Sequence, residues 1–181
     1  MAETVERTYR PMLEAVAFAA RAHRGQLRKD RETPYASHVF RVCLVVRHVF
    51  GIDNPHVLTA AALHDTVEDT TTDFDELKDE FGEKVAGWVA DLSKDKRLPD
   101  TEREKAYEAR LAQATWEVKV CKLADVFDNL MDSVHMPAEK KARSVRNAHR
   151  YLTALKSNLP EEARRPWEIV SRLLTEIEAK K

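Results

Sequence analysis

The sequence is poor in glycine and in long apolar runs, and both shortages narrow the fold class. It has only four glycines in 181 residues. Apolar residues recur three and four positions apart throughout, and strand-like alternation is nowhere sustained. We therefore predict an all-α fold. No apolar run approaches the roughly 20 residues that a membrane-spanning helix needs, so a membrane protein is not expected.

Cysteine is also scarce, which argues against a disulfide framework or a thiolate metal site. The two cysteines, Cys43 and Cys121, each lie among apolar residues. Neither has partners at zinc-ligand or redox spacing, so we expect both to be buried thiols in a reduced, cytosolic protein. The N-terminus has neither the basic start nor the apolar body of a secretory signal. We therefore expect a cytoplasmic location.

The chain has no excess of charge of either sign. Its 30 basic and 31 acidic residues give a formal net charge of -1. This balance argues against general binding to nucleic acid or to a membrane surface, although it allows a local basic pocket for a small anion. The charge balance is thus compatible with a small-molecule ligand, and the sequence does not predict an oligomeric state.

What the sequence does have is enough apolar residues for a sizeable core. With 43% hydrophobic residues, we predict one helical domain over residues 1–181. Its core spans about 11–158, and a C-terminal helix over 166–179 packs on it. Periodicity and capping residues predict helices over 11–23, 37–50, 55–70, 72–82, 83–92, from 101 onward, 118–131, 137–158 and 166–179. Pro11 and Pro166 are the expected first residues of their helices, and Ser37 and Thr101 are the expected caps of theirs.

The stretch His64-Asp65-Thr66-Val67-Glu68-Asp69 carries the strongest chemical signal. It follows an apolar run over 57–63, with Asn54 as the predicted helix cap and Pro55 as the first helical residue. On one helix, His64, Asp65, Glu68 and Asp69 would fall within an arc of roughly 140°. Their mutual repulsion favours a divalent metal between them. The alternative is a solvated acidic helix end.

Asp125 is the second unusual residue, because it interrupts the apolar segment 118–124. Burying an unpaired carboxylate costs on the order of several kcal/mol, so Asp125 needs a partner. An ion pair with Lys122 would supply one, but a metal shared with His64 and Asp65 is the explanation we favour. Asn129, four residues later, shares the helix face of Asp125.

These residues and one more histidine make a candidate metal site. His38 lies at the predicted start of the second helix, and with His64, Asp65 and Asp125 it gives two imidazoles and two carboxylates. Ligands of this kind suit manganese, iron or zinc, and the two carboxylates favour Mn²⁺. Glu68 and Asp69 would then position a metal-activated water and take its proton.

Basic residues that come before and after this set indicate an anionic substrate. Arg28 and Lys29 precede His38 by a few residues and would reverse the repulsion between a polyphosphate and the carboxylates. Lys96 and Arg146 are further candidates for such contacts. The chain has no glycine-rich phosphate loop and no plausible serine or cysteine nucleophile.

The order His38, His64-Asp65, Asp125 resembles the metal ligands of the HD superfamily of metal-dependent phosphohydrolases. Further motifs resemble the hydrolase domain of RelA/SpoT proteins, and together they cover roughly residues 15–132. These motifs are Arg28-Lys29-Asp30, Thr33-Pro34-Tyr35, His64 to Thr70, and Lys122-Leu123-Ala124-Asp125 through Asn129.

The resemblance implies an activity and a set of residue roles. It implies removal of the 3′-pyrophosphate from guanosine tetra- and pentaphosphate, typically with manganese. The four ligands would bind the metal, and Glu68 and Asp69 would activate water. Substrate contacts would come from Arg28, Lys29 and Asn129. At 181 residues the chain is similar to small stand-alone alarmone hydrolases of the Mesh type.

Two other functions stay open at this point. The same metal and water would serve another nucleotide phosphohydrolase, such as a phosphatase that removes the ribose 2′-phosphate of NADPH. A nucleotide-binding sensor with little activity is a third interpretation. Asp128 and Met131 depart from the family pattern near Asn129, where the nucleotide would bind.

Overall fold

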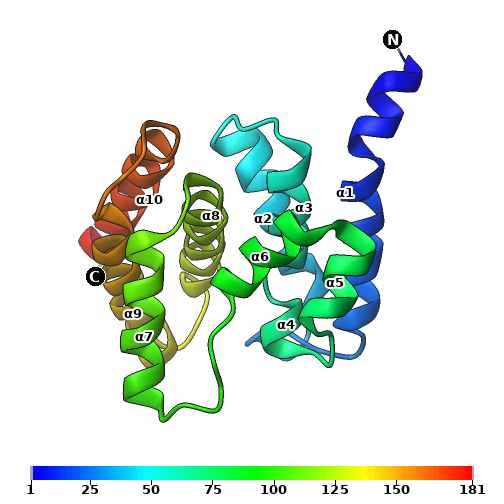
Figure 1. Cartoon of the computed structure of the whole chain (residues 1–181). Helices are drawn as coiled ribbons and strands as arrows, with labels where there is room; N and C mark the ends of the chain where they lie inside the picture. Colours follow the sequence, from blue (N-terminus) through cyan, green and yellow to red (C-terminus); the bar gives the residue numbers. More distant parts are fainter. Residues whose placement is uncertain (1, 181) are drawn as a thin grey trace. The chain divides into compact units, whose positions relative to one another are not determined.

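The computed structural model describes residues 2–180, with side chains described from residue 6 onward. In this range the secondary structure is helical apart from one isolated β-bridge between Leu27 and Pro34. The prediction of an all-α fold is therefore confirmed. None of the helices within residues 2–180 combines the length and the apolar character needed to cross a bilayer. In chain order (Figure 1), the helices are α1 Ala2–Ala22, α2 Ala36–Leu44, the π-helix η1 Val45–Val49, α3 Pro55–Leu63, α4 Thr66–Asp69, α5 Phe74–Phe81, α6 Glu83–Leu92, α7 Asp100–Gln113, α8 Trp116–Ser133, α9 Ala138–Lys156 and α10 Glu161–Ala179.

The helices divide into two compact units, Met1–Lys94 and Asp95–Lys181. Each unit has its own buried apolar residues. The assignment of residues 1–181 to one functional domain, with a core over 11–158 and a packed helix over 166–179, stays a prediction.

In the first unit, α3 is the central helix. Every residue from Val57 to Leu63 is buried, and α1, α2 and α6 pack against it. Asn54 caps α3 as predicted, because its side chain accepts hydrogen bonds from the backbone N–H groups of His56 and Val57. A helix that is apolar all round is held on every side. The residues that follow α3 are therefore anchored to a rigid element.

In the second unit, α8 packs against α9 and α10, and α7 packs against α9. Most of α8 is buried, from Val118 through Val126. Cys121 lies in this buried stretch and Cys43 lies in α2; both are free thiols, as predicted. Burial raises the pKa of Cys43 to about 12, so this thiol is protonated at neutral pH.

Two helices begin earlier than predicted, and the reason is the same for both. Pro11 and Pro166 were each expected as a first helical residue, but they lie inside α1 and α10. Good helix-forming residues, rich in Glu, Arg and Ala, precede each proline and extend the helix. The backbone hydrogen bond that each proline cannot donate does not end these helices.

Three further predictions about helix ends are wrong. Ser37 and Thr101 were expected to cap α2 and α7, but the capping positions are Tyr35 and Pro99, and neither helix has a side-chain capping bond. The helix expected over 37–50 is α-helical only to Leu44 and then becomes the π-helix η1. Gly51 follows it with φ 75°, a left-handed conformation that favours glycine and ends the helix.

Lys119 connects two helix ends in the second unit. Its side chain is buried, with 1% of its surface exposed. The ammonium donates to the carbonyl oxygens of Ala112 at 3.0 Å, Leu155 at 3.2 Å and Ser157 at 2.5 Å. These carbonyls belong to the C-terminal ends of α7 and α9, which lack partners within their own helices. Lys119 therefore caps two helices with one charge.

Replacing Lys119 by methionine is expected to lower the free energy of unfolding by about 1.5–3 kcal/mol, since it removes charge-assisted hydrogen bonds to three carbonyls. Urea denaturation followed by circular dichroism measures this difference. The matched control is Lys105→Met on the exposed face of α7, with an expected change within about 0.5 kcal/mol. Equal stability of the two variants would contradict the capping role.

Candidate metal centre

The candidate site lies at a break between α3 and α4. Two side chains bond to backbone carbonyls at this break: the Leu63 carbonyl accepts the Thr66 hydroxyl at 2.7 Å, and the Ala61 carbonyl accepts His64 Nδ1–H at 2.8 Å. These bonds satisfy carbonyls of the last turn of α3. The expectation that His64 through Asp69 lie on one continuous helix is therefore wrong.

Asp65 occupies the turn between the two helices. Its backbone angles, φ -103° and ψ -3°, lie in the bridge region, where many active-site residues are found. It stands at the capping position of α4, yet its side chain makes no capping bond. The carboxylate is instead directed toward two imidazoles and a phenol.

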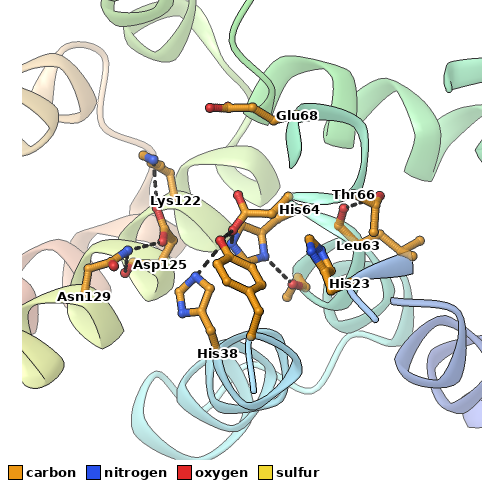
Figure 2. Close-up of polar contacts among 12 residues, drawn as sticks. His23, His38, Leu63, His64, Thr66, Glu68, Lys122, Asp125 and Asn129 are labelled. Carbon is orange, nitrogen blue, oxygen red and sulfur yellow. Dashed lines mark hydrogen bonds and ion pairs between the residues drawn. The ribbon is translucent and has the colours of Figure 1, made fainter. Parts of the chain in front are cut away.

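His38, His64 and Asp65 form a compact cluster of potential metal ligands, and Figure 2 labels the two histidines. One ligand atom from each of the three residues lies within 4.8 Å of the others. Asp65 Oδ2 is 2.9 Å from His64 Nε2 and 3.5 Å from His38 Nε2. The Tyr35 hydroxyl donates to the same oxygen at 2.5 Å. Both histidines are buried, so these contacts are shielded from water.

The donor set fits a divalent cation. A carbonyl oxygen only accepts, so His64 Nδ1 carries the hydrogen of its bond to Ala61. In the neutral ring, Nε2 then presents a lone pair toward the Asp65 carboxylate. Two acceptors at this separation need a cation between them, and a carbonyl-bound histidine is the usual form of a metal ligand. The cluster therefore suggests a divalent metal site.

The charge of Asp65 is strongly stabilised. When no metal is bound, burial acts to raise the pKa of Asp65, but the charge of a protonated His64 and hydrogen bonds from His38 and His64 outweigh it and hold the pKa well below its usual range. The carboxylate is ionised at neutral pH, which is the form that binds a metal.

Glu68 and Asp69, the predicted catalytic carboxylates, lie on α4. The Glu68 carboxylate is half-buried and accepts the backbone N–H of Lys94 at 2.9 Å. Asp69 is exposed, and its backbone oxygen accepts a hydrogen bond from the Gln26 side chain at 2.7 Å. Their roles in water activation stay predictions.

Asp125, the predicted fourth ligand, lies on α8 in the second unit and is 7% exposed. Its Oδ2 accepts Lys122 Nζ at 2.7 Å, and its Oδ1 accepts Asn129 Nδ2 at 2.5 Å (Figure 2). The ion pair that the sequence left as an alternative is thus present. The roles of Asp125 as a ligand and of Asn129 as a ribose contact stay predictions.

Lys122 is itself enclosed by aromatic rings. Its ammonium lies 5.2 Å from the ring centroid of Tyr107 and 4.4 Å from that of Tyr151. Burial lowers the pKa of Lys122, but Asp125 and the two tyrosines outweigh this effect and hold the pKa well above its usual range. Lys122 is therefore a fixed positive charge beside Asp125.

The predicted substrate residues differ in exposure. Arg28 is buried, and its guanidinium carbon lies 5.6 Å from the Tyr35 ring centroid. Lys29, Lys96 and Arg146 are exposed. None of these four roles is tested by their positions, and they stay predictions.

Sequence reasoning gave no role to three residues that connect Asp65 and Asp69 to the rest of the first unit, although Tyr35 lies in one of the motifs that carry the resemblance. They are His23, Gln26 and Tyr35, which join α1, the following loop and α2 to the α3–α4 break. Tyr35 could have been found, because a tyrosine three residues before a proposed ligand histidine on a helix shares its face. No spacing rule connects His23 to a residue that is 42 positions away in the chain.

The sequence of the chain matches a family profile and several named relatives. A family profile described as the HD domain matches residues 15–154. The chain is 45% identical over 122 residues to the guanosine-3′,5′-bis(diphosphate) 3′-pyrophosphohydrolase MESH1 of Homo sapiens, which covers 67% of this chain and 68% of that protein. The MESH1 of Xenopus tropicalis is 43% identical over the same length, with the same coverage of both chains.

The fold of the chain also matches a solved structure. It is that of a metazoan orthologue of SpoT that hydrolyses ppGpp, and it matches with a TM-score of 0.79 and 31% identity. The match covers 94% of each chain. Its identity is high enough to support kinship as well as a common fold.

Replacing His64 by alanine is expected to weaken divalent-cation binding by more than about 100-fold, because it removes a ligand atom together with its anchoring bond to Ala61. Isothermal titration of the metal-stripped protein with Mn²⁺ and with Zn²⁺ measures the affinity. His56→Ala, at an exposed position of α3, is the control and is expected to bind like the wild type. Unchanged binding by the His64 variant would exclude the cluster as the metal centre.

Proposed function

The chain belongs to the HD-domain family, and on that premise we propose that it removes the 3′-pyrophosphate from guanosine tetra- and pentaphosphate. The products are GDP or GTP and pyrophosphate. One observation carries the proposal: the His38–His64–Asp65 cluster, in which both histidines are buried and Asp65 is half-buried, lies in a chain 45% identical to human MESH1, a protein named for this reaction.

The proposed cofactor is Mn²⁺. Two imidazole nitrogens and a carboxylate oxygen are ligands that manganese accepts, and a second carboxylate, from Asp125, would favour it over zinc. When bound, the ion supplies acidification of water and neutralisation of phosphate charge. The protein holds the ligands for it in a buried cluster whose geometry is fixed by the bonds to Ala61 and Tyr35.

The carboxylates of α4 have a separate task in this proposal. Release of pyrophosphate requires that the bond between the ribose 3′-oxygen and phosphorus break while a water oxygen bonds to that phosphorus. The water must lose a proton, for which Glu68 and Asp69 are the proposed acceptors, and the departing 3′-oxygen takes up a proton to become the ribose hydroxyl. The Lys94 N–H holds one oxygen of Glu68, so its carboxylate is oriented before the substrate binds.

Basic residues before α2 would bind the substrate phosphates. Lys29 is exposed and has a flexible ammonium, so it suits a diffusing anion. Arg28 is buried beside Tyr35, whose hydroxyl donates to Asp65. We therefore propose that Lys29 contacts a substrate phosphate directly and that Arg28 contributes to substrate binding from the same loop.

The activity is tested by incubating purified protein with Mn²⁺ and guanosine tetraphosphate, with GDP and pyrophosphate as the expected products. Glu68→Gln keeps the size and the acceptor for the Lys94 N–H but removes the base, so kcat is expected to fall by about 10²–10⁴-fold. Metal affinity should stay near that of the wild type. A panel containing NADPH and other nucleotides is run in parallel. Turnover of a panel member without turnover of guanosine tetraphosphate would refute the proposed substrate.

The role of Asp125 needs a test that separates ligand from ion pair. Asp125→Ala leaves the buried Lys122 without its counter-charge, which is expected to lower stability by about 3–5 kcal/mol. Pairing it with Lys122→Met removes both charges and is expected to restore most of that stability.

If Asp125 is a ligand, the double variant is stable but has lost Mn²⁺ binding and turnover. Thermal unfolding, metal titration and the pyrophosphate assay on the same preparations give the three readings. A stable double variant with wild-type activity would show that Asp125 serves only the ion pair.

A further inference from the structure

We propose that His23 is a positioning residue for the metal centre: it holds the Tyr35 hydroxyl against Asp65 and, through Gln26, holds the end of α4. The inference rests on the metal-binding part of the proposed function. It adds a role for a residue outside the ligand, carboxylate and substrate sets, and all the residues that it uses belong to the first unit.

His23 lies directly after α1 and is 2% exposed. Its ring stacks on the Tyr35 ring, with centroids 4.7 Å apart and planes at 29°. His23 Nδ1 lies 2.9 Å from Gln26 Oε1. The Gln26 amide nitrogen donates to the Asp69 carbonyl at 2.7 Å, so the Gln26 oxygen must accept and His23 Nδ1 must donate. This fixes the tautomer of His23.

The other ring nitrogen indicates that stability alone does not account for this histidine. His23 Nε2 is buried and has no hydrogen-bond partner among the described residues. A buried polar atom without a partner costs about 1–3 kcal/mol. Leucine would fill a similar volume without that cost. The imidazole is therefore explained by what its donor and its flat ring do, which is to orient Gln26 and Tyr35.

Tyr35 transmits this orientation to the metal ligand. Its hydroxyl donates to Asp65 Oδ2 at 2.5 Å, a charge-assisted bond to a ligand oxygen. The His23 ring packs on Tyr35 face to face, while the His38 ring meets it edge-on at 5.5 Å. With the His23 ring removed, Tyr35 gains freedom to turn, and Asp65 loses the fixed donor that aims its carboxylate.

Gln26 connects His23 to Asp69, the last residue of α4. Its backbone oxygen accepts the Tyr35 N–H at 2.9 Å, and its side chain contacts both His23 and the Asp69 carbonyl. The segment from His23 to Tyr35 thus holds Asp65 through a hydroxyl and Asp69 through an amide. One residue, His23, contacts both holding groups.

A double-mutant cycle tests whether His23 acts through Tyr35. The variants are Tyr35→Phe, which keeps the ring and removes the hydroxyl, His23→Leu, and the combination. Each single variant is expected to weaken Mn²⁺ binding to the metal-stripped protein by about 10-fold, as other residues that orient metal ligands do. The combination is expected to bind no more weakly than Tyr35→Phe alone. The matched control, His56→Leu at an exposed site, should bind like the wild type.

A purely structural role for His23 gives a different result. It would lower the melting temperature of His23→Leu and leave Mn²⁺ affinity unchanged, which overturns the proposal. The proposal is also overturned if the loss of Mn²⁺ affinity in the double variant equals the product of the losses in the two single variants. If His23→Leu does not fold, the same cycle with His23→Asn decides, because asparagine keeps a donor for Gln26 and lacks the stacking ring.

The two proposals fail in distinguishable ways. Manganese titration uses no nucleotide, so a wild-type protein that binds Mn²⁺ but does not hydrolyse guanosine tetraphosphate overturns the substrate and leaves the cycle to be judged on its own. An active wild type with multiplying effects overturns only the role of His23. A wild type that binds no divalent cation overturns both.

Discussion

The structure of the candidate site depends on one carboxylate oxygen, Asp65 Oδ2. Two imidazole nitrogens and a phenol converge on it from α2, from the end of α3 and from the residue before α2. Such a concentration of polar groups in a buried place is stable only if each has a partner of opposite character. A divalent cation would satisfy that condition for the carboxylate and both imidazole nitrogens at once.

The break after α3 is what makes this convergence possible. Had the helix continued through Asp69, Asp65 would point from its surface at a fixed angle of about 100° from His64. Instead, side chains of His64 and Thr66 take up carbonyls of the last turn, and Asp65 adopts bridge-region angles. The adjacent residues His64 and Asp65 can then present their ligand atoms to the same point, which adjacent residues on a regular helix do less well.

The sequence predicted the fold class and the clustering of His38, His64 and Asp65 better than it predicted the local geometry. Apolar periodicity and Asn54 predicted α3 with its cap, and the His-Asp pair directed attention to two residues of the cluster. Two kinds of feature could not be predicted from the sequence. Prolines were taken as helix starts where helix-forming residues on their N-terminal side extend α1 and α10. The contacts of His23 and Tyr35 depend on the tertiary path of a loop, which periodicity does not encode.

Asp125 shows that a buried charge predicts a charged partner but does not by itself predict a function. Its burial demanded a partner, and the structure supplies Lys122 at 2.7 Å together with Asn129. That pair neutralises Asp125, so the argument from burial no longer requires a metal at this residue. Ligation by Asp125 would have to compete with an ammonium that Tyr107 and Tyr151 hold in place. Ligation by Asp125 would therefore cost the free energy of that ion pair, and its net gain would be smaller than for a carboxylate without a bound ammonium.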